Sequence, residues 1–344
     1  MNDFVQALKK VVSVNETVLF KSDGSNLEIS TISDDLDIKV TITSNYKLNC
    51  STNGKVLSDF LRSAKDITLE QKEQSLLVKF DDSELELPIY PTDSFPEFPE
   101  PTGDKIFVSS KDLIGAFKKV DFIPIREWYQ PFKASVLFEY QYDLLKIVAT
   151  DDHRLAVVKI ITNEEKPTEQ KELCLSKDTI SKLKNILPMQ GEVSLLFSDK
   201  GLFFNCQNAE GTIDLFANSI VGEFPDYERV LPGNELDACN FELWKDKLVQ
   251  SLSRVSLITD VVKISVDENL EIFGESEKGK FKEVIPTLEF NGKVNAWFNV
   301  KYLLQPLTHL EDEKVTLRFN DNNFVSVNSS QYVYVLCPVE VPNA

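Results

Sequence analysis

The chain repeats one order of elements three times, and this internal repeat constrains its fold more than any other feature. ALKKV at residues 7–11 matches AFKKV at residues 116–120 in four of five positions, and SLSRV at residues 251–255 is a weaker third copy. Three further helical segments are centred on leucines that are 122 and 121 residues apart, namely Leu61, Leu183 and Leu304. Alternating segments of strand character lie between the helices. Because this period far exceeds that of solenoid repeats, whole domains have been duplicated.

Two stretches rich in turn-forming residues separate the copies. YPTDSFPEFPEPTGDK, residues 90–105, holds four prolines and is predicted to be an extended connection, and VLPGNELDA, residues 230–238, supplies the second. A length of 344 residues suits two or three domains. We therefore predict domains at residues 1–103, 104–232 and 233–344. Each is α+β, with an antiparallel sheet on one side and two helices on the other.

Composition excludes several classes of protein. No apolar run reaches about 18 residues, and the first residues lack the basic-then-apolar order of a signal peptide, so we expect a soluble, cytoplasmic protein without membrane contact. The five cysteines are scattered and show no CxxC spacing, which indicates reduced structural thiols rather than disulfides or zinc. We expect no metal and no cofactor.

Charge is distributed unevenly between the helices and the rest of the chain. The net charge of −18 argues at first against nucleic acid, but the six candidate helical segments carry 14 basic and 6 acidic residues. These segments are residues 4–12, 57–66, 111–120, 177–186, 242–255 and 299–310. Any amphipathic helix has a charged outer face, which is the simpler interpretation. The alternative is that six helices share one concave, positive surface that attracts duplex DNA.

Two short strings are more specific than the composition. TDDHRLAV occupies residues 150–157, and FPDYERVLP occupies residues 224–232. Together and in this order they resemble the beta subunits of bacterial DNA polymerase III, the sliding clamps. The resemblance implies three tandem clamp domains in a homodimeric ring, with sheets outside and helices inside. It also implies a non-enzymatic processivity factor that slides on duplex DNA and binds polymerase and clamp loader through short linear peptides.

The resemblance implies a peptide-binding pocket formed by both strings and the C-terminal strand. Its residues are Thr150, His153, Arg154, Leu155, Pro225, Arg229, Val230, Cys337, Pro338 and Val339. The pocket suits a peptide of the QLxLF type, with apolar walls for affinity and His153, Arg154 and Arg229 for orientation. The family usually has Met-Pro-Met where this chain has Cys337-Pro338-Val339, so we expect a wider pocket.

The resemblance also assigns DNA-facing and dimer-forming residues. The DNA-facing set is Lys9, Lys10, Arg62, Lys65, Lys118, Lys119, Arg126, Trp128, Tyr129, Lys182, Lys184, Lys245, Arg254 and Lys301. The dimer contacts are Leu85, Leu87, Leu257 and Ile258. The first domain departs from the family pattern, because the loop after its first helix is shortened to VVSVNETVLF.

Two other functions compete with the clamp. A clamp-derived interaction module would bind peptides without encircling DNA, and the last helical segment, which retains Lys301 alone and contains Pro306, favours it slightly. An enzyme could instead use Asp151, Asp152 and His153. The chain contains no nucleophile elbow, P-loop, HExxH or GxGxxG motif, which argues against catalysis.

Overall fold

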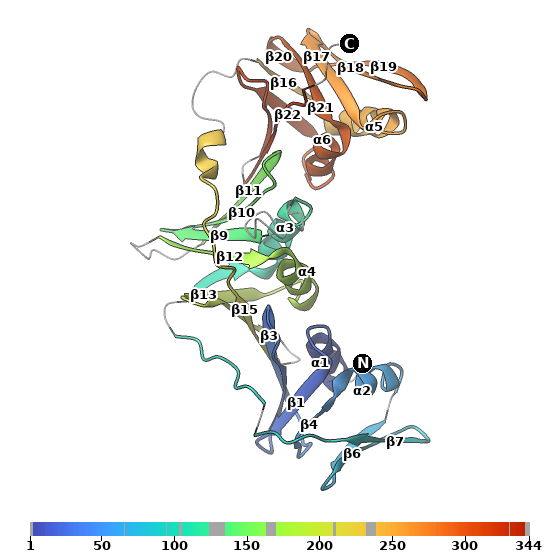
Figure 1. The fold of residues 1–344 in the computed structure, drawn as a ribbon, viewed down its shortest axis with the longest axis vertical. Coiled ribbons are helices and arrows are strands. Elements are labelled where there is room, and N and C mark those ends of the chain that lie inside the picture. Colours follow the sequence, from blue (N-terminus) through green and yellow to red (C-terminus); the bar gives the residue numbers. More distant parts are fainter. Residues whose placement is uncertain are drawn as a thin grey trace. The chain divides into compact units, whose positions relative to one another are not determined.

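The computed structural model describes residues 3–64, 66–93, 95–102, 105–123, 135–162, 170–208, 211–231, 239–329 and 331–340 (Figure 1). Six α-helices lie in this part of the chain, one for each predicted helical segment. They are α1 (Asp3–Val12), α2 (Gly54–Phe60), α3 (Ser110–Val120), α4 (Lys177–Ile186), α5 (Lys245–Val255) and α6 (Val300–Leu307). Over the same residues, no helix has both the length and the apolar character that crossing a bilayer demands.

Three helices are shorter than predicted, and α6 is one of them, because it ends at Leu307 rather than at residue 310. α2 ends at Phe60 rather than at residue 66, and a hydrogen-bonded turn closes its end. α5 begins at Lys245 rather than at residue 242, because the residues before it continue strand β16 (Cys239–Trp244). Strand pairing there satisfies the backbone groups that a longer helix would otherwise use, so the sheet sets the start of the helix.

An eight-stranded antiparallel sheet has the strand order β4-β1-β2-β3-β15-β14-β13-β8. A separate three-stranded antiparallel sheet has the order β5-β6-β7. The strands are β1 (Thr17–Ser22), β2 (Asn26–Thr31), β3 (Leu36–Thr43), β4 (Asn49–Asn53), β5 (Ile67–Gln71), β6 (Ser75–Phe80), β7 (Ser83–Pro88), β8 (Ile106–Ser109), β13 (Glu192–Ser198), β14 (Gly201–Asn208) and β15 (Gly211–Asn218). Strand β12 (Lys171–Ser176) leads into α4.

The later part of the chain forms a second large sheet and a smaller one. The large sheet contains the strand order β9-β10-β11-β24-β23-β22-β16-β20. The four-stranded sheet has the order β19-β18-β17-β21. The strands are β9 (Ser135–Gln141), β10 (Leu144–Thr150), β11 (Arg154–Ile161), β17 (Val261–Asp267), β18 (Asn269–Ser276), β19 (Gly279–Pro286), β20 (Glu289–Gly292), β21 (Val294–Asn299), β22 (Lys314–Phe319), β23 (Val325–Asn328) and β24 (Tyr332–Leu336). A short 3-10 helix, η2 (Tyr227–Val230), carries part of the second string.

Long-range contacts divide the chain into two compact units, described here separately. Unit 1 comprises Met1–Gly115, Tyr140–Leu144 and Ile161–Val221, and unit 2 comprises Ala116–Glu139, Leu145–Ile160 and Gly222–Ala344. The predicted middle domain is thus shared between the units. The cause is strand pairing, because the β3–β15 and β11–β24 ladders each join residues from two predicted domains. The division into three domains stays a prediction.

Helices and sheets meet through alternating apolar positions. On β17, Val262, Ile264 and Val266 are buried while the residues between them are more exposed, as period-two patterning requires. Helix α5 packs on β18 and β19 and contacts α6, while α1 packs on β2 and β3 and contacts α2. Gly274 permits the close approach of α5, because a Cβ there would lie 2.5 Å from the Val255 side chain.

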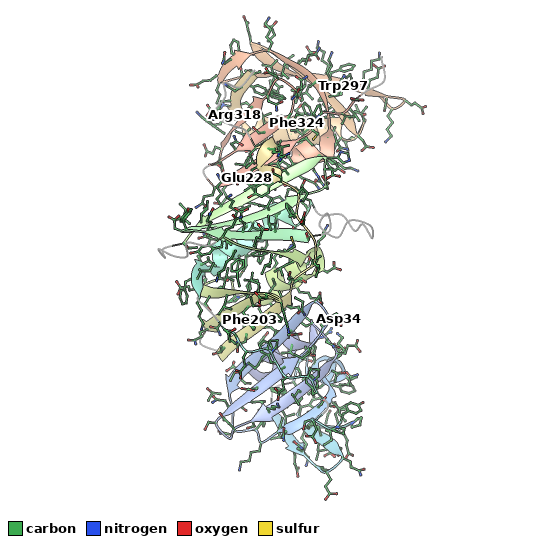
Figure 2. All side chains as sticks on the ribbon, turned by 60° about the vertical axis from the view of Figure 1, so that its left-hand side comes forward. Asp34, Phe203, Glu228, Trp297, Arg318 and Phe324 are labelled. Carbon is green, nitrogen blue, oxygen red and sulfur yellow. The ribbon has the colours of Figure 1, made fainter. Side chains whose placement is uncertain are left out.

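The proline-rich connection is extended where it is described, as predicted (Figure 1). Phe98 from this connection packs on a cluster formed by Leu196, Phe203 and Phe216, and Phe203 is labelled in Figure 2. The ammonium group of Lys39 lies 5.0 Å from the centre of the Phe98 ring, which adds a cation–π contact. An aromatic anchor therefore holds the connection against strands β13, β14 and β15 of the same unit.

Asp37 is a buried acid on β3, with 4% of its surface exposed. It lies opposite Phe216 of β15, and its Oδ1 accepts the Ser33 N–H at 3.0 Å. Burial raises the pKa of this carboxyl to about 6, and the nearby charge of Asp35 acts in the same direction. Because the folded state favours the protonated form, this group stabilises the fold below its ordinary pKa of 3.8, and that contribution is lost as the pH rises through about 6.

Replacing Asp37 with Asn should stabilise the protein at neutral and basic pH, because Asn keeps an acceptor for Ser33 without a buried charge. At pH 8 we expect a gain in unfolding free energy of about 1 kcal/mol. The gain should shrink as the pH falls from about 6 toward 4. Melting temperatures of both proteins across this range provide the measurement, and a gain that is the same at every pH would contradict the assignment.

Candidate functional site

The first string forms the tight turn between β10 and β11. The Thr150 hydroxyl donates to the carbonyl of Arg154 at 2.8 Å, and the Asp151 N–H donates to the same carbonyl at 3.2 Å. Asp152 adopts a left-handed backbone conformation with φ of 68°, which Asp tolerates better than most residues. The turn leaves Asp152 and His153 exposed and directs Arg154 inward.

The Arg154 side chain forms several hydrogen bonds and an ion pair. Only 4% of its surface is exposed, and its Nε and Nη2 lie 2.9 and 2.8 Å from Oδ2 of Asp151. Its Nη1 donates to Oε1 of Gln305 on α6, and its guanidinium lies 3.8 Å from the ring centre of Tyr302. Charge-assisted bonds of this kind are about twice as strong as neutral ones, so the turn is anchored to α6.

The same guanidinium also reaches the segment after α3. Its Nη2 lies 3.4 and 3.3 Å from the carbonyl oxygens of Phe122 and Ile123. The Phe122 ring stacks on the imidazole of His309, just after α6, with the ring centres 5.2 Å apart. One buried cation therefore ties together the turn, α6 and residues 122–123.

This placement bears on the sequence prediction for two pocket residues. Arg154 was expected to orient a peptide, but its guanidinium is buried among internal partners. Leu155 was expected to form part of an apolar wall of the pocket, and its side chain is buried in β11, opposite Val335 of β24. Both residues support the turn from its buried side. The position of a residue in a strand does not by itself show which face of that strand is covered.

Both carboxylate oxygens of Asp151 accept hydrogen bonds that stabilise the turn. Its Oδ1 accepts the backbone N–H groups of His153 and Arg154 at 3.2 and 2.9 Å, and its Oδ2 accepts the guanidinium. Among the residues that the structure describes, no group of three or more His, Cys, Asp and Glu side chains is placed to hold a metal ion. These contacts explain the Asp151-Asp152-His153 string as a stabilised turn.

The C-terminal strand lies beside this turn. The Cys337 N–H donates to the carbonyl of His153 at 2.9 Å, and its Sγ lies 3.7 Å from the carbonyl oxygen of Asp152. Two residues later, the Val339 N–H donates to the carbonyl of Trp297 at 2.7 Å, and Trp297 is labelled in Figure 2. Cys337, Pro338 and Val339 are half-buried. Burial and the nearby Asp151 and Asp152 carboxylates raise the pKa of the Cys337 thiol, so it stays protonated at neutral pH.

A buried ionic cluster holds the second string. The Tyr227 hydroxyl donates to Oε2 of Glu139 on β9 at 2.9 Å. Lys146 of β10 bridges Glu139 at 2.7 Å and Glu228 at 2.8 Å, and Glu228 is labelled in Figure 2. Burial opposes the charge on Lys146, but its hydrogen bonds to Glu139 and Glu228 raise its pKa above the ordinary value. The string is thereby fixed to the sheet that carries the first string.

The outward residues of the second string are the accessible part of the predicted pocket. Val230 is 48% exposed, and Pro225 is half-buried. Arg229 is exposed and pairs with Asp226 at 2.6 Å. With His153 from the first string, these side chains are available to a ligand. A cavity of about 480 Å³ lies elsewhere in unit 2, between residues such as Ser265, and none of the predicted pocket residues lines it.

The predicted DNA-facing residues fall into four groups. Four form ion pairs within their own unit: Arg62 with Asp59 at 3.0 Å, Lys182 with Asp35 at 2.9 Å, Lys301 with Asp260 at 3.7 Å, and Arg254 with Glu283. Lys245 donates to the carbonyl of Leu310 at 2.6 Å. Lys9, Lys10, Lys118, Lys119 and Lys184 lie on α1, α3 and α4. Lys65, Arg126, Trp128 and Tyr129 lie outside the described residues.

The predicted dimer residues differ in exposure. Leu257, just after α5, is 76% exposed, and Ile258 is half-buried. On β7, Leu85 is half-buried and Leu87 is buried. Sequence reasoning did not find the supporting residues Glu139, Lys146, Tyr302 and Gln305. Lysine and glutamate in strands usually face solvent, so no local signal marks them.

Comparisons with known proteins agree with this architecture. A family model described as "DNA polymerase III beta subunit, central domain" matches residues 108–226, and one described as "DNA polymerase III beta subunit, C-terminal domain" matches residues 228–339. The beta sliding clamp of Helicobacter pylori is 28% identical over 282 residues, which cover 78% of this chain and 73% of that protein. The beta sliding clamp of Haemophilus influenzae is 26% identical over 329 residues, which cover 89% of this chain and 87% of that protein.

Solved structures show the same fold. The DNA polymerase III subunit beta of Pseudomonas aeruginosa superposes with a TM-score of 0.89 at 22% identity and covers 98% of each chain. A structure from Eubacterium rectale, titled a putative DNA polymerase III beta subunit, has a TM-score of 0.88 at 18% identity and covers 98% of this chain and 97% of that one.

The buried pair makes a specific prediction about stability. Replacing Arg154 with Ala leaves the Asp151 carboxylate buried without its cation, so the unfolding free energy should fall by about 3–5 kcal/mol. Arg229→Ala is the matched control, because it removes an exposed arginine whose pair with Asp226 contributes at most about 1 kcal/mol. Urea denaturation followed by circular dichroism measures both. If the two variants unfold at the same urea concentration, Arg154 is not the anchor.

Proposed function

The chain belongs to the DNA polymerase III beta-subunit family, the beta sliding clamps, and from this membership we propose that it acts as a DNA polymerase processivity factor. Two copies close into a ring around duplex DNA in the cytoplasm, and the ring is a non-enzymatic tether for DNA polymerase and clamp loader. The observation that carries the proposal is the hydrogen bond from Cys337 to the carbonyl of His153. It supports one binding surface for the first string and the C-terminal strand.

The charge distribution supports sliding rather than tight binding. Lysines on α1, α3 and α4 attract phosphate, while the ion pairs of Arg62, Lys182, Arg254 and Lys301 reduce the net positive charge available to it. Contacts to phosphate alone carry no sequence information, so moving along the duplex exchanges one set of contacts for an equal one. In this proposal topology, and not affinity, retains the ring on DNA.

The partner site combines an accessible surface with a rigid support. His153, Arg229 and Val230 meet the peptide, while Arg154 and Leu155 hold the turn behind them. The short side chains of Cys337 and Val339 leave room for a larger peptide anchor than the methionines usual in the family would. The domains at residues 1–103, 104–232 and 233–344 belong to the same proposal, in which the second and third domains both contribute residues to the partner site.

A clamp-derived module that binds peptides without encircling DNA is the second candidate. The observation that favours it is the pairing of Lys301, the only cation of α6, with Asp260. That helix would then offer DNA little positive charge. Retention on circular DNA separates the two functions.

Charge reversal on α3 tests DNA encirclement. The double variant Lys118→Glu and Lys119→Glu should be retained less on nicked circular DNA, because a ring that opens is no longer held near the phosphates, and the salt dependence of binding to linear duplex should become shallower by about 1–2 in log–log slope. The matched control is Lys21→Glu with Lys200→Glu, which changes the net charge equally at exposed positions outside the helices. Gel filtration with the plasmid gives the retained fraction. Equal retention of both variants would mean that α3 does not face DNA.

Trimming an exposed apolar side chain tests the partner site. Val230→Ala should weaken binding of a fluorescent QLxLF-type peptide by about 1–3 kcal/mol, the usual range for losing an interface anchor. Val221→Ala is the control, because Val221 is 92% exposed and lies outside the proposed pocket. Fluorescence anisotropy gives both affinities, and equal affinities would place the partner site elsewhere. Leu155→Ala is less informative, since its burial couples binding to stability.

A further inference from the structure

The connection after the first predicted domain is attached to unit 1 through the side chain of Phe98. This side chain packs on a buried cluster formed by Leu196, Phe203 and Phe216. Pro96 and Pro99 lie on either side of Phe98 and have no backbone N–H to donate. In residues 96–102, all of which the structure describes, no hydrogen bond links the connection to a strand. The attachment described here is thus a packed ring and not a ladder of hydrogen bonds.

The surface beneath this ring is aromatic. The rings of Phe203 on β14 and Phe216 on β15 have centres 4.4 Å apart, and Phe203 is labelled in Figure 2. The ammonium group of Lys39, on β3, lies 5.0 Å from the centre of the Phe98 ring and 3.7 Å from the Asp214 carboxylate. Aromatic surfaces of this kind bind proline-rich segments, whose extended conformation is formed before binding. The cation adds a preference for an aromatic anchor over an aliphatic one.

Two hydrogen bonds fix the end of β15, the strand that carries Phe216. The Asn218 N–H donates to the carbonyl of Asp35 at 3.0 Å, in the turn between β2 and β3. The Ile220 N–H donates to the carbonyl of Cys174 at 2.8 Å, and Cys174 lies three residues before α4 begins. The end of β15 is therefore bonded both to a turn between two strands and to the strand that leads into a helix.

The same pair of bonds occurs in unit 2. There the Cys337 N–H donates to the carbonyl of His153, in the turn between β10 and β11. The Val339 N–H donates to the carbonyl of Trp297, which lies three residues before α6 begins. In each unit the two donors are two residues apart. The internal repeat thus gives the end of β15 the same bonding pattern as the C-terminal segment of the proposed partner site.

Strand register extends this correspondence to the surface beneath Phe98. Phe216 lies opposite Asp37 of β3, and Val335 of β24 lies opposite Leu155 of β11. Each of these two residues, on β15 and on β24, lies two positions before the first hydrogen-bond donor of its unit. Phe216 is therefore the counterpart of Val335, which pairs with a residue of the predicted pocket. Phe98 thus covers, in unit 1, the counterpart of a surface beside the proposed partner site of unit 2.

We propose that the surface beneath Phe98 is a second peptide site, for a proline-rich segment with one aromatic anchor, and that the chain's own connection occupies it. A partner that carries such a segment competes with the connection, because displacement breaks ring contacts and no backbone ladder. The connection has the advantage of attachment, since a short flexible link acts like a free peptide at about millimolar concentration. The site is therefore closed to weak ligands. This inference goes beyond the proposed function, which concerns a different surface.

A peptide supplied in trans tests the inference. Phe98→Ala empties the surface, so a fluorescent peptide of residues 95–102, FPEFPEPT, should bind this variant about tenfold or more tightly than it binds the unmodified protein. Fluorescence anisotropy should give one bound peptide per chain. The peptide FPEAPEPT lacks the anchoring ring and should not bind. Glu97→Ala is the matched control, because Glu97 is an exposed residue of the same connection, and it should behave like the unmodified protein.

A second variant keeps the test decisive if circular dichroism shows that Phe98→Ala fails to fold. Pro96→Gly with Pro99→Gly loosens the connection without changing the cluster beneath it, so it should bind FPEFPEPT more tightly than the unmodified protein does. The second site is overturned if neither variant gains affinity, or if FPEAPEPT binds as well as FPEFPEPT. It is also overturned if a QLxLF-type peptide displaces FPEFPEPT, because the binding would then belong to the partner site of unit 2. Loss of retention on circular DNA leaves these affinities unchanged, so the proposed function can fail separately.

Discussion

The buried pair of Arg154 and Asp151 is the interaction on which the arrangement of unit 2 depends. A guanidinium with little contact to water requires several acceptors, and these come from the turn after β10, from Gln305 of α6 and from the carbonyls of residues 122 and 123. Satisfying one charge therefore brings three distant segments together. This anchor fixes the positions of the exposed His153 and of the C-terminal strand beside it.

A second cluster, built around Lys146, performs the same task for the second string. Tyr227 of η2 donates to Glu139, and Glu228 of η2 accepts from Lys146, so two strand residues fix η2 through one hydrogen bond each. Both strings of the proposed partner site are thus supported by ionic contacts to buried side chains, while their outer residues stay exposed. This design gives a rigid surface at the points where a short peptide would dock, which limits the entropy lost on binding.

Charge in this protein acts mainly through its distribution. Four of the predicted DNA-facing cations are paired with carboxylates of their own unit, so the helices offer a moderate positive field rather than a strong one. A net charge of −18 for the whole chain is therefore compatible with the proposed sliding on DNA.

Periodicity and the internal repeat predicted all six helices, the extended connection and the α+β class, because amphipathic spacing and prolines act locally. The two strings identified the family, because each is formed by residues that are adjacent in sequence, such as Asp151 and Arg154 of the turn. The sequence could not determine that Arg154 and Leu155 are buried or that Glu139 and Lys146 support the second string. Nor could it show that the β3–β15 and β11–β24 ladders cross the predicted domain limits. These features depend on residues far apart in the chain, and only tertiary packing brings such residues together.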